Sequence, residues 1–158
     1  MRPPEPEPDA GAADAGRAAR RGLGLIIHSG DFGRVHYALL MASAALAVGR
    51  PAILFFTMDA CRALAVAGRA GPGWHDLGPD SAGRPAATRD NALAAAGIAT
   101  FETLLGACRE LGATFMACET GLRACGLVPD ALRQDLAIAI TGVVSFYQAA
   151  RAADILFI

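Results

Sequence analysis

The stretch GLGLIIHSGDFGRVHYALLMASAALAVG, residues 22–49, contains a strand, a turn and a helix in succession, and it decides the fold class. Residues 22–28 are almost continuously apolar, which is typical of a strand buried on both faces of a parallel sheet. Residues 29–33 are rich in glycine and predict a loop. Residues 34–48 then predict a helix, which Gly49 ends. The folded part of the chain therefore begins with a strand–helix unit.

The same alternation of short apolar runs and helical stretches continues to the end of the chain. Alternating strands and helices, with strands that are apolar throughout, predict a parallel sheet with helices on both faces. We therefore expect a single three-layer α/β domain over residues 21–158, with about five mainly parallel strands. The expected strands cover residues 22–28, 52–57, 114–117, 136–140 and 155–158; the expected helices cover residues 34–48, 59–67, 101–111 and 143–153, with a short helix after Pro129.

The composition separates a tail from this domain. Residues 1–20 are rich in proline, alanine and acids and contain no aromatic residue, so we expect a disordered tail. The whole chain is 54% hydrophobic and 18% charged, and the part after the tail has eleven acids and eleven arginines. A neutral, apolar domain favours a homo-oligomer, with a trimer, a tetramer and a hexamer all open. It also lacks the basic excess that nucleic-acid binding needs.

Lysine is missing from the chain, and its fourteen basic residues other than histidine are all arginine. This excludes Schiff-base chemistry, a pyridoxal phosphate anchor and the phosphate-loop lysine of nucleotide hydrolases. Gly22 and Gly24 are not a dinucleotide fingerprint, because they lie within the strand and a third glycine is missing. We therefore expect no cofactor.

Targeting signals are also missing from the sequence. The amino-terminal segment has acids and prolines where a secretory signal needs positive charge and an apolar run. No apolar stretch reaches the ~18 residues of a membrane-spanning helix. We expect a cytoplasmic protein without stable membrane insertion, and four cysteines that are mostly reduced.

Cys118 is the strongest candidate for chemistry. The surrounding sequence, TFMACETGLRACG, places it at the carboxyl end of a strand and just before a helix turn or loop. Open α/β sheets build their ligand sites at this edge. The positive end of a helix dipole would also favour the thiolate, which is the reactive form of cysteine. Cysteine is among the most frequently buried residues, so a packing role is the alternative.

The other three cysteines have different expected environments. Cys61 follows the second strand and has some access to the same sheet edge, with a role as a small core residue as the alternative. Cys108 lies on the apolar stripe of its helix and is expected to be a buried structural thiol. Cys125 is a possible partner of Cys118, but a continuous helix would hold them about 10 Å apart, too far for a disulfide. A looped path through the intervening glycines would bring them together.

Two further side chains could tune the Cys118 thiol. His28 ends the first strand and should face the same edge, where an imidazolium would lower the thiol pKa. A capping role in the following loop is the alternative for His28. Glu119 is adjacent in sequence and would raise the thiol pKa if it pointed at the sulfur. The histidines and cysteines show no short paired spacing, so we expect no metal site.

The loop after the first strand is a candidate anion site, because its glycines precede the free amides of a helix start. A tight strand-to-helix turn that needs glycine is the alternative. The residues of this candidate site are Ser29, Gly30, Asp31, Gly33 and Arg34.

A second long loop covers residues 68–90, which are rich in glycine and proline and contain Trp74 and His75. Loops of this length in a compact domain are usually functional or mobile. We expect this segment either to cover the site or a partner surface, or to be a mobile surface excursion.

Most of the domain resembles the DsrE/DsrF/TusD-like family, in particular its DsrE-like "peroxiredoxin family" branch. The resemblance is carried by residues 22–49, 52–61, 97–127 and 140–158. Its most specific part is GIATFETLLGACRELG followed by ACE. The peroxiredoxin label has no support in the residues, because the proline–threonine–cysteine peroxidatic motif is missing.

This resemblance implies a small parallel α/β domain that assembles into homo-oligomers and takes part in sulfur relay. It also implies that a cysteine at the position of Cys118 holds sulfane sulfur as a persulfide. We therefore expect a sulfur carrier or sulfurtransferase that depends on Cys118, with sulfur donor and acceptor proteins as partners. The alternative is a non-catalytic oligomeric module that binds a small molecule or a partner on the same scaffold.

Overall fold

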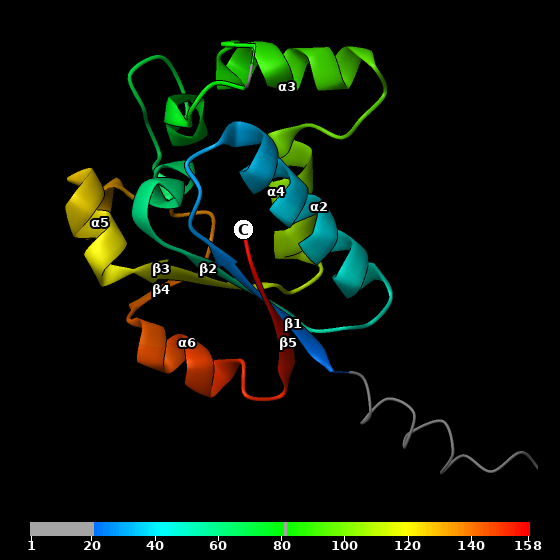
Figure 1. Cartoon of the computed structure of the whole chain (residues 1–158), viewed down its shortest axis with the longest axis vertical. Coiled ribbons are helices and arrows are strands. Elements are labelled where there is room, and N and C mark those ends of the chain that lie inside the picture. Colours follow the sequence, from blue (N-terminus) through cyan, green and yellow to red (C-terminus); the bar gives the residue numbers. More distant parts are fainter. Residues whose placement is uncertain (1–20, 81) are drawn as a thin grey trace, which may run out of the picture.

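The computed structural model describes residues 21–80 and 82–158, and the expected tail lies outside this range. Five strands form one parallel sheet in the order β4-β3-β2-β1-β5, which confirms the predicted single α/β domain (Figure 1). The strands are β1 (Gly22–Ile27), β2 (Ala52–Phe56), β3 (Thr114–Cys118), β4 (Ile138–Thr141) and β5 (Ala153–Phe157).

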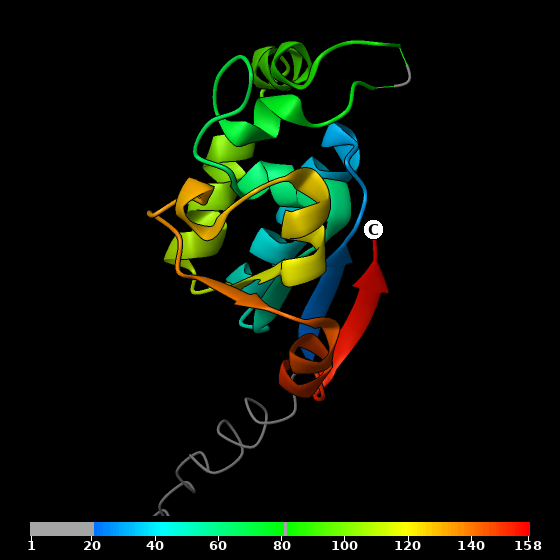
Figure 2. The same ribbon diagram turned by 90° about the vertical axis from the view of Figure 1, so that its left-hand side faces the viewer.

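Helices cover both faces of the sheet, but to different extents (Figures 1 and 2). One face is covered by α2 (Phe32–Ala47) and α4 (Phe101–Glu110) and carries the larger of two core clusters. The opposite face is covered by the seven-residue α6 (Val143–Ala149) and carries the smaller cluster. Because successive side chains of a strand point to opposite faces, β1, β2 and β3 contribute to both clusters.

The starts of the two large helices follow from local sequence. Asp31 caps α2, because its carboxylate accepts a hydrogen bond from the Arg34 amide at 2.9 Å. Thr100 caps α4 by accepting from the Thr103 amide, which confirms the predicted cap. The apolar stripe of α4, which includes Cys108, is buried as expected.

Three elements differ from the prediction. Residues 59–67 were expected to be a helix and instead contain the 3-10 helix η1 (Met58–Leu64). The helix α3 (Ala86–Ala95) was not predicted; its ten residues bury only Ala86 and Asp90, so it has no apolar stripe to detect. The last helix ends at Ala149 instead of residue 153, and β5 begins at Ala153 instead of residue 155. The other short helices are η2 (Gly73–Asp76), α5 (Glu119–Cys125) and η3 (Pro129–Ala131).

The segment 68–90 does not cover Cys118, contrary to one of the two expectations for it. Trp74 is 5% exposed, stacks on Phe101 with ring centroids 5.0 Å apart, and donates from Nε1 to Glu102 at 2.9 Å. These contacts belong to the larger core cluster, whereas Cys118 belongs to the cluster on the opposite face. The tryptophan thus anchors this segment over α4.

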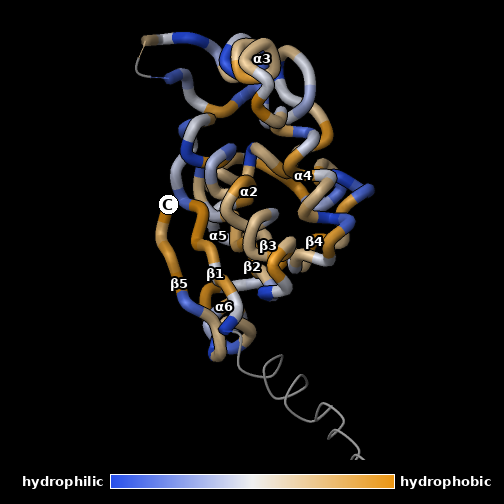
Figure 3. The backbone as a smooth tube through the Cα atoms, turned by 90° about the vertical axis from the view of Figure 1, so that its right-hand side faces the viewer, coloured by the Kyte–Doolittle hydropathy of each residue, from blue (hydrophilic) through white to orange (hydrophobic). Residues whose placement is uncertain are grey.

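The face carrying α6 and the neighbouring edge strand β5 leaves apolar side chains exposed. Val144 is 71% exposed, Tyr147 is 52% exposed, and Phe157 at the end of β5 is 70% exposed. Figure 3 shows apolar residues continuing along β1 and the end of β5. We name these three exposed residues, together with Val143 and Ile155, the α6-side surface. Within the described residues, no helix has the length and hydrophobicity needed to cross a membrane.

Candidate functional site

Cys118 is the last residue of β3 and the N-cap of α5, so it lies where the sequence placed it. It pairs in register with Thr141 of β4, at the carboxyl ends of both strands. On the other side of β3, the register of β2 ends one residue earlier with Phe56 opposite Ala117, which brings Thr57 level with Cys118. The thiol therefore lies at the edge of the sheet where open α/β proteins bind their ligands.

Three residues near the Cys118 thiol affect its pKa: Thr57, Thr120 and Gly121. Burial by itself raises the pKa of this thiol, but hydrogen bonds from the Thr57 hydroxyl, the Gly121 amide, and the Thr120 amide and hydroxyl outweigh burial. The pKa of Cys118 consequently lies below its ordinary value. Hydrogen bonds of this kind stabilise the thiolate, which is the nucleophilic form.

The thiol is nevertheless almost enclosed. Cys118 is 5% exposed and packs in the smaller cluster with Phe55, Met116 and Phe146. The Phe146 ring stacks on Phe55 at a centroid distance of 5.1 Å, which holds α6 against the sheet. Phe146 is thus a packing residue. The site combines donors suited to a thiolate with a cover formed by α6.

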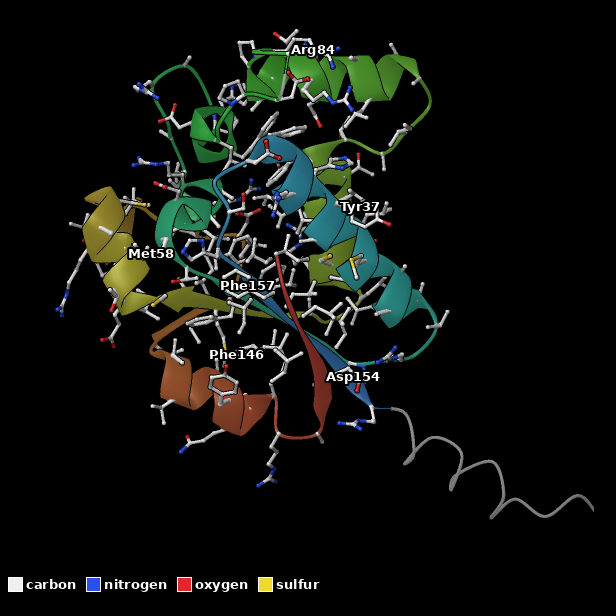
Figure 4. The ribbon with its side chains drawn as sticks, viewed as in Figure 1. Tyr37, Met58, Arg84, Phe146, Asp154 and Phe157 are labelled. Atoms are coloured by element: carbon white, nitrogen blue, oxygen red, sulfur yellow. The ribbon has the colours of Figure 1, made fainter. Side chains whose placement is uncertain are left out.

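The helix α5, which begins after Cys118, packs closely against η1. A Cβ atom on Gly121 would lie 2.4 Å from the Met58 backbone nitrogen and 2.8 Å from the Cys61 sulfur. Only glycine allows this approach. Met58 adopts a left-handed backbone with φ of 49°, uncommon for a residue with a side chain (Figure 4). Strained residues of this kind often occur at functional sites.

Cys61 and Cys108 are both fully buried. Burial, followed by the nearby Cys125 and Cys118, raises the pKa of Cys61 to about 12. Burial raises the pKa of Cys108 to about 11. Both thiols are therefore protonated near neutral pH. For Cys108 this agrees with the structural role expected from the sequence.

Cys125 is the last residue of α5, so the residues between Cys118 and Cys125 form one helix. This arrangement keeps the two thiols apart, and the looped path does not occur. Burial raises the pKa of Cys125, and the charge of Arg62 partly offsets this increase. The Cys125 thiol donates to the Met58 carbonyl oxygen at 3.2 Å.

His28 and Glu119 are both exposed and are not brought onto the Cys118 sulfur. The ring of His28 lies against Phe157 with centroids 5.4 Å apart. His28 directly follows β1, and β2 separates β1 from β3. His28 therefore does not face Cys118, contrary to the expectation. Glu119 starts α5 with its side chain exposed.

The candidate anion site at residues 29–34 is better described as a cap. The Ser29 hydroxyl accepts a hydrogen bond from the Asp31 amide at 3.1 Å. The Asp31 carboxylate in turn accepts from the Arg34 amide, which a bound anion would need as a donor. The neighbouring hollow of about 320 Å³ is lined by Gly30, Asp59, Arg62, Asp76 and Gly78. It carries two carboxylates and one guanidinium, so its charge disfavours an anion. The turn interpretation, which the sequence left open, accounts for the loop.

Of the three residues that act on the Cys118 sulfur, sequence reasoning missed Thr57. Thr120 and Gly121 lie two and three residues after Cys118, in the turn that the sequence predicted there, and their backbone amides agree with that prediction. Thr57 is distant in sequence and had no such signal. Among residues 21–80 and 82–158, no group of three or more histidine, cysteine or acidic side chains is arranged to hold a metal ion.

Comparison with known proteins supports the fold. The chain is similar to a solved structure from Methanobacterium thermoautotrophicum, MTH1491, which is a protein of unknown function. The TM-score is 0.56 at 13% sequence identity, and the match covers 87% of this chain and 99% of that chain. At this identity the likeness shows the fold alone. No protein-family model matches the sequence, and no match is found among curated proteins.

Proposed function

We propose that this protein is a DsrE-like sulfur carrier that holds sulfane sulfur as a persulfide on Cys118. The observation that carries the proposal is the position of Cys118 at the carboxyl end of β3 and the start of α5, where Thr57, Thr120 and Gly121 lower the pKa of its thiol. Groups that lower a thiol pKa stabilise the thiolate that must attack a donor persulfide, and they would also stabilise the persulfide anion that results. The family resemblance of residues 22–158 supports the same role.

The transfer needs no cofactor. The Cys118 thiolate attacks the outer sulfur of a donor persulfide, a new S–S bond forms on Cys118, and the donor leaves as a thiolate. Attack on the Cys118 persulfide by an acceptor thiolate, in the same way, passes the sulfur on. The exposed Thr120 and the half-buried Thr141 mark the edge from which a partner protein would approach.

A mass measurement tests this role directly. The intact protein is incubated with thiosulfate and a rhodanese-type sulfurtransferase and then measured with and without a reducing agent. We expect a gain of one sulfur atom, about 32 Da, that the reducing agent removes. The Cys118→Ser variant should lose this gain, while Cys108→Ser should keep it. If both variants gain sulfur like the parent, the proposal fails.

The enclosure of Cys118 favours a second candidate function, a non-catalytic oligomeric binding module. With the residue 5% exposed and covered by α6, a large donor protein has limited access in the isolated chain. A parent protein that gains no sulfur under these conditions, although it is folded, would support this second function.

We also propose that the chain assembles into a homo-oligomer through the α6-side surface. A soluble monomer rarely exposes a large contiguous apolar patch without a partner for it. The α6-side surface exposes five apolar side chains on α6 and β5, and α6 is also the cover over Cys118. Assembly in this way would place a second subunit close to the sulfur-carrying site.

A further inference from the structure

Cys61 and Cys125 form a second group of thiols at the interface between α5 and η1. Cys61 is in η1 and is fully buried, whereas Cys125 ends α5 and is half-buried. Neither thiol supplies one of the hydrogen bonds that hold the Cys118 sulfur. The proposed sulfur transfer therefore does not use either thiol.

Met58, at the start of η1, brings Cys125 next to the segment that carries Cys61, whose own thiol donates to the Phe56 carbonyl oxygen at 3.5 Å. The Cys125 thiol donates to the Met58 carbonyl oxygen at 3.2 Å. In a 3-10 helix that carbonyl is directed at the amide three residues on, which belongs to Cys61. Gly121 lies one helical turn before Cys125, and its Cβ position is 2.8 Å from the Cys61 sulfur. Both sulfurs thus lie against one face of α5, within about one turn of each other.

Other cysteine pairs fit less well. Cys118 and Cys125 lie at opposite ends of α5, which holds them about 10 Å apart along the helix axis. Cys61 lies near the Cys118 backbone, but the Cys118 side chain belongs to the cluster under α6 and the Cys61 side chain belongs to the cluster on the opposite face. Cys108 is in α4, where its thiol donates to the Leu39 carbonyl oxygen at 3.5 Å. The pair Cys61–Cys125 is therefore the one that the fold favours.

We propose that Cys61 and Cys125 close to an intramolecular disulfide by exchange with a low-molecular-weight disulfide such as oxidised glutathione. The more accessible Cys125 loses its proton and attacks first, which breaks the glutathione S–S bond, forms a mixed disulfide and releases one glutathione thiolate. Cys61 then loses its proton to solvent and attacks the Cys125 sulfur, which releases the second glutathione. Two protein thiols are oxidised and one glutathione disulfide is reduced. The new bond ties α5, whose first amides hold Cys118, to η1.

The arginine-only composition makes the pairing easy to assign. The full chain is equilibrated in glutathione buffers of stepped redox ratio, quenched with acid, alkylated and digested with trypsin. Cleavage after each arginine that proline does not follow leaves Arg50–Pro51 intact. It places Cys61 in residues 35–62, Cys108 in 90–109, Cys118 in 110–123 and Cys125 in 124–133. We expect peptides 35–62 and 124–133 to be joined in most molecules at the oxidising end of the series, and separate at the reducing end.

Variants separate this pairing from other outcomes and from sulfur transfer. Cys108→Ser and Cys118→Ser should both keep the joined peptides, and Cys125→Ser should lose them while staying folded by circular dichroism. Because Cys118→Ser loses the persulfide but keeps this link, failure of one proposal is distinguishable from failure of the other. A folded parent protein with no link at any ratio, a glutathione adduct on Cys125 that never closes, or a link from peptide 110–123 would each overturn the pairing.

Discussion

The hydroxyl of Thr57 donates to the sulfur of Cys118 across neighbouring ends of β2 and β3. The two residues are 61 positions apart in the chain, and only the parallel pairing of the two strands makes them neighbours. This hydrogen bond is the first of those that offset the effect of burial on the thiol pKa. It links the architecture of the sheet to the reactivity of one sulfur atom.

Thr57→Val should raise the pKa of Cys118, because it removes this hydroxyl and keeps a side chain of similar shape. A hydrogen bond to a charged group stabilises it enough to shift a pKa by on the order of one unit. The pH dependence of iodoacetamide labelling of peptide 110–123 measures the change. Thr114→Val is the matched control, since it makes the same substitution at the other, exposed end of β3. An unchanged pKa in Thr57→Val would show that the hydroxyl does not act on the thiol.

Gly121→Ala should destabilise the fold by about 1–3 kcal/mol, the usual cost of forcing an atom into a packed contact. The added Cβ would lie 2.4 Å from the Met58 nitrogen, so α5 must move away from η1. Urea unfolding measures the loss, and thiol labelling should show a higher pKa for Cys118. Gly106→Ala is the control: it lies in α4 with nothing within 4 Å of its Cβ position. That variant should gain roughly 0.5–1 kcal/mol, because alanine stabilises helices relative to glycine. Equal effects of the two substitutions would refute the close approach of α5.

Alkaline pH should reduce the stabilising contribution of Cys108. Burial raises its pKa from 9.0 to about 11 in the folded chain, so above pH 9 the unfolded chain loses this proton first. Proton loss from the unfolded state lowers the free energy of unfolding by about 1.4 kcal/mol per pH unit, until the folded thiol ionises as well. The stability difference between the parent and Cys108→Ala should therefore shrink between about pH 9 and about 11. Urea unfolding at stepped pH measures this, and a constant difference would contradict the raised pKa.

Arg133→Met should weaken the packing of the 68–90 segment. Arg133 bonds to Glu102 at 2.6 Å and to Asp135 at 2.8 Å, and Glu102 also accepts from the Trp74 indole. Breaking a partly buried network of charged groups should cost roughly 1–3 kcal/mol. Thermal unfolding and tryptophan fluorescence report the change, because Trp74 is the only tryptophan. Arg151→Met, at an exposed position, should leave both signals unaltered.

Phe157→Ser should reduce self-association, since Phe157 is 70% exposed on the α6-side surface. Light scattering after size-exclusion chromatography measures the mass of the particle. Ile98→Ser, which removes an exposed apolar side chain between α3 and α4, is the control and should not change that mass. A monomeric parent protein, or the same particle mass in all three proteins, would argue against this surface as the interface.

The sequence by itself determined the order of strands and helices, the parallel class of the sheet and the position of Cys118 at the end of a strand. These features follow from local patterns: apolar runs, helix caps such as Thr100, and the glycines that end helices. The helix α3 escaped prediction for the same reason, because its alanine-rich sequence lacks an apolar stripe.

Only the tertiary structure decided what surrounds the Cys118 sulfur. Strand order made β2 the neighbour of β3, and so placed Thr57 beside the thiol and His28 away from it. The packing of α5 on η1 made Gly121 indispensable and brought Cys125 to Met58. These relationships join segments that are far apart in the chain, and they depend on register and packing, which local sequence patterns do not encode.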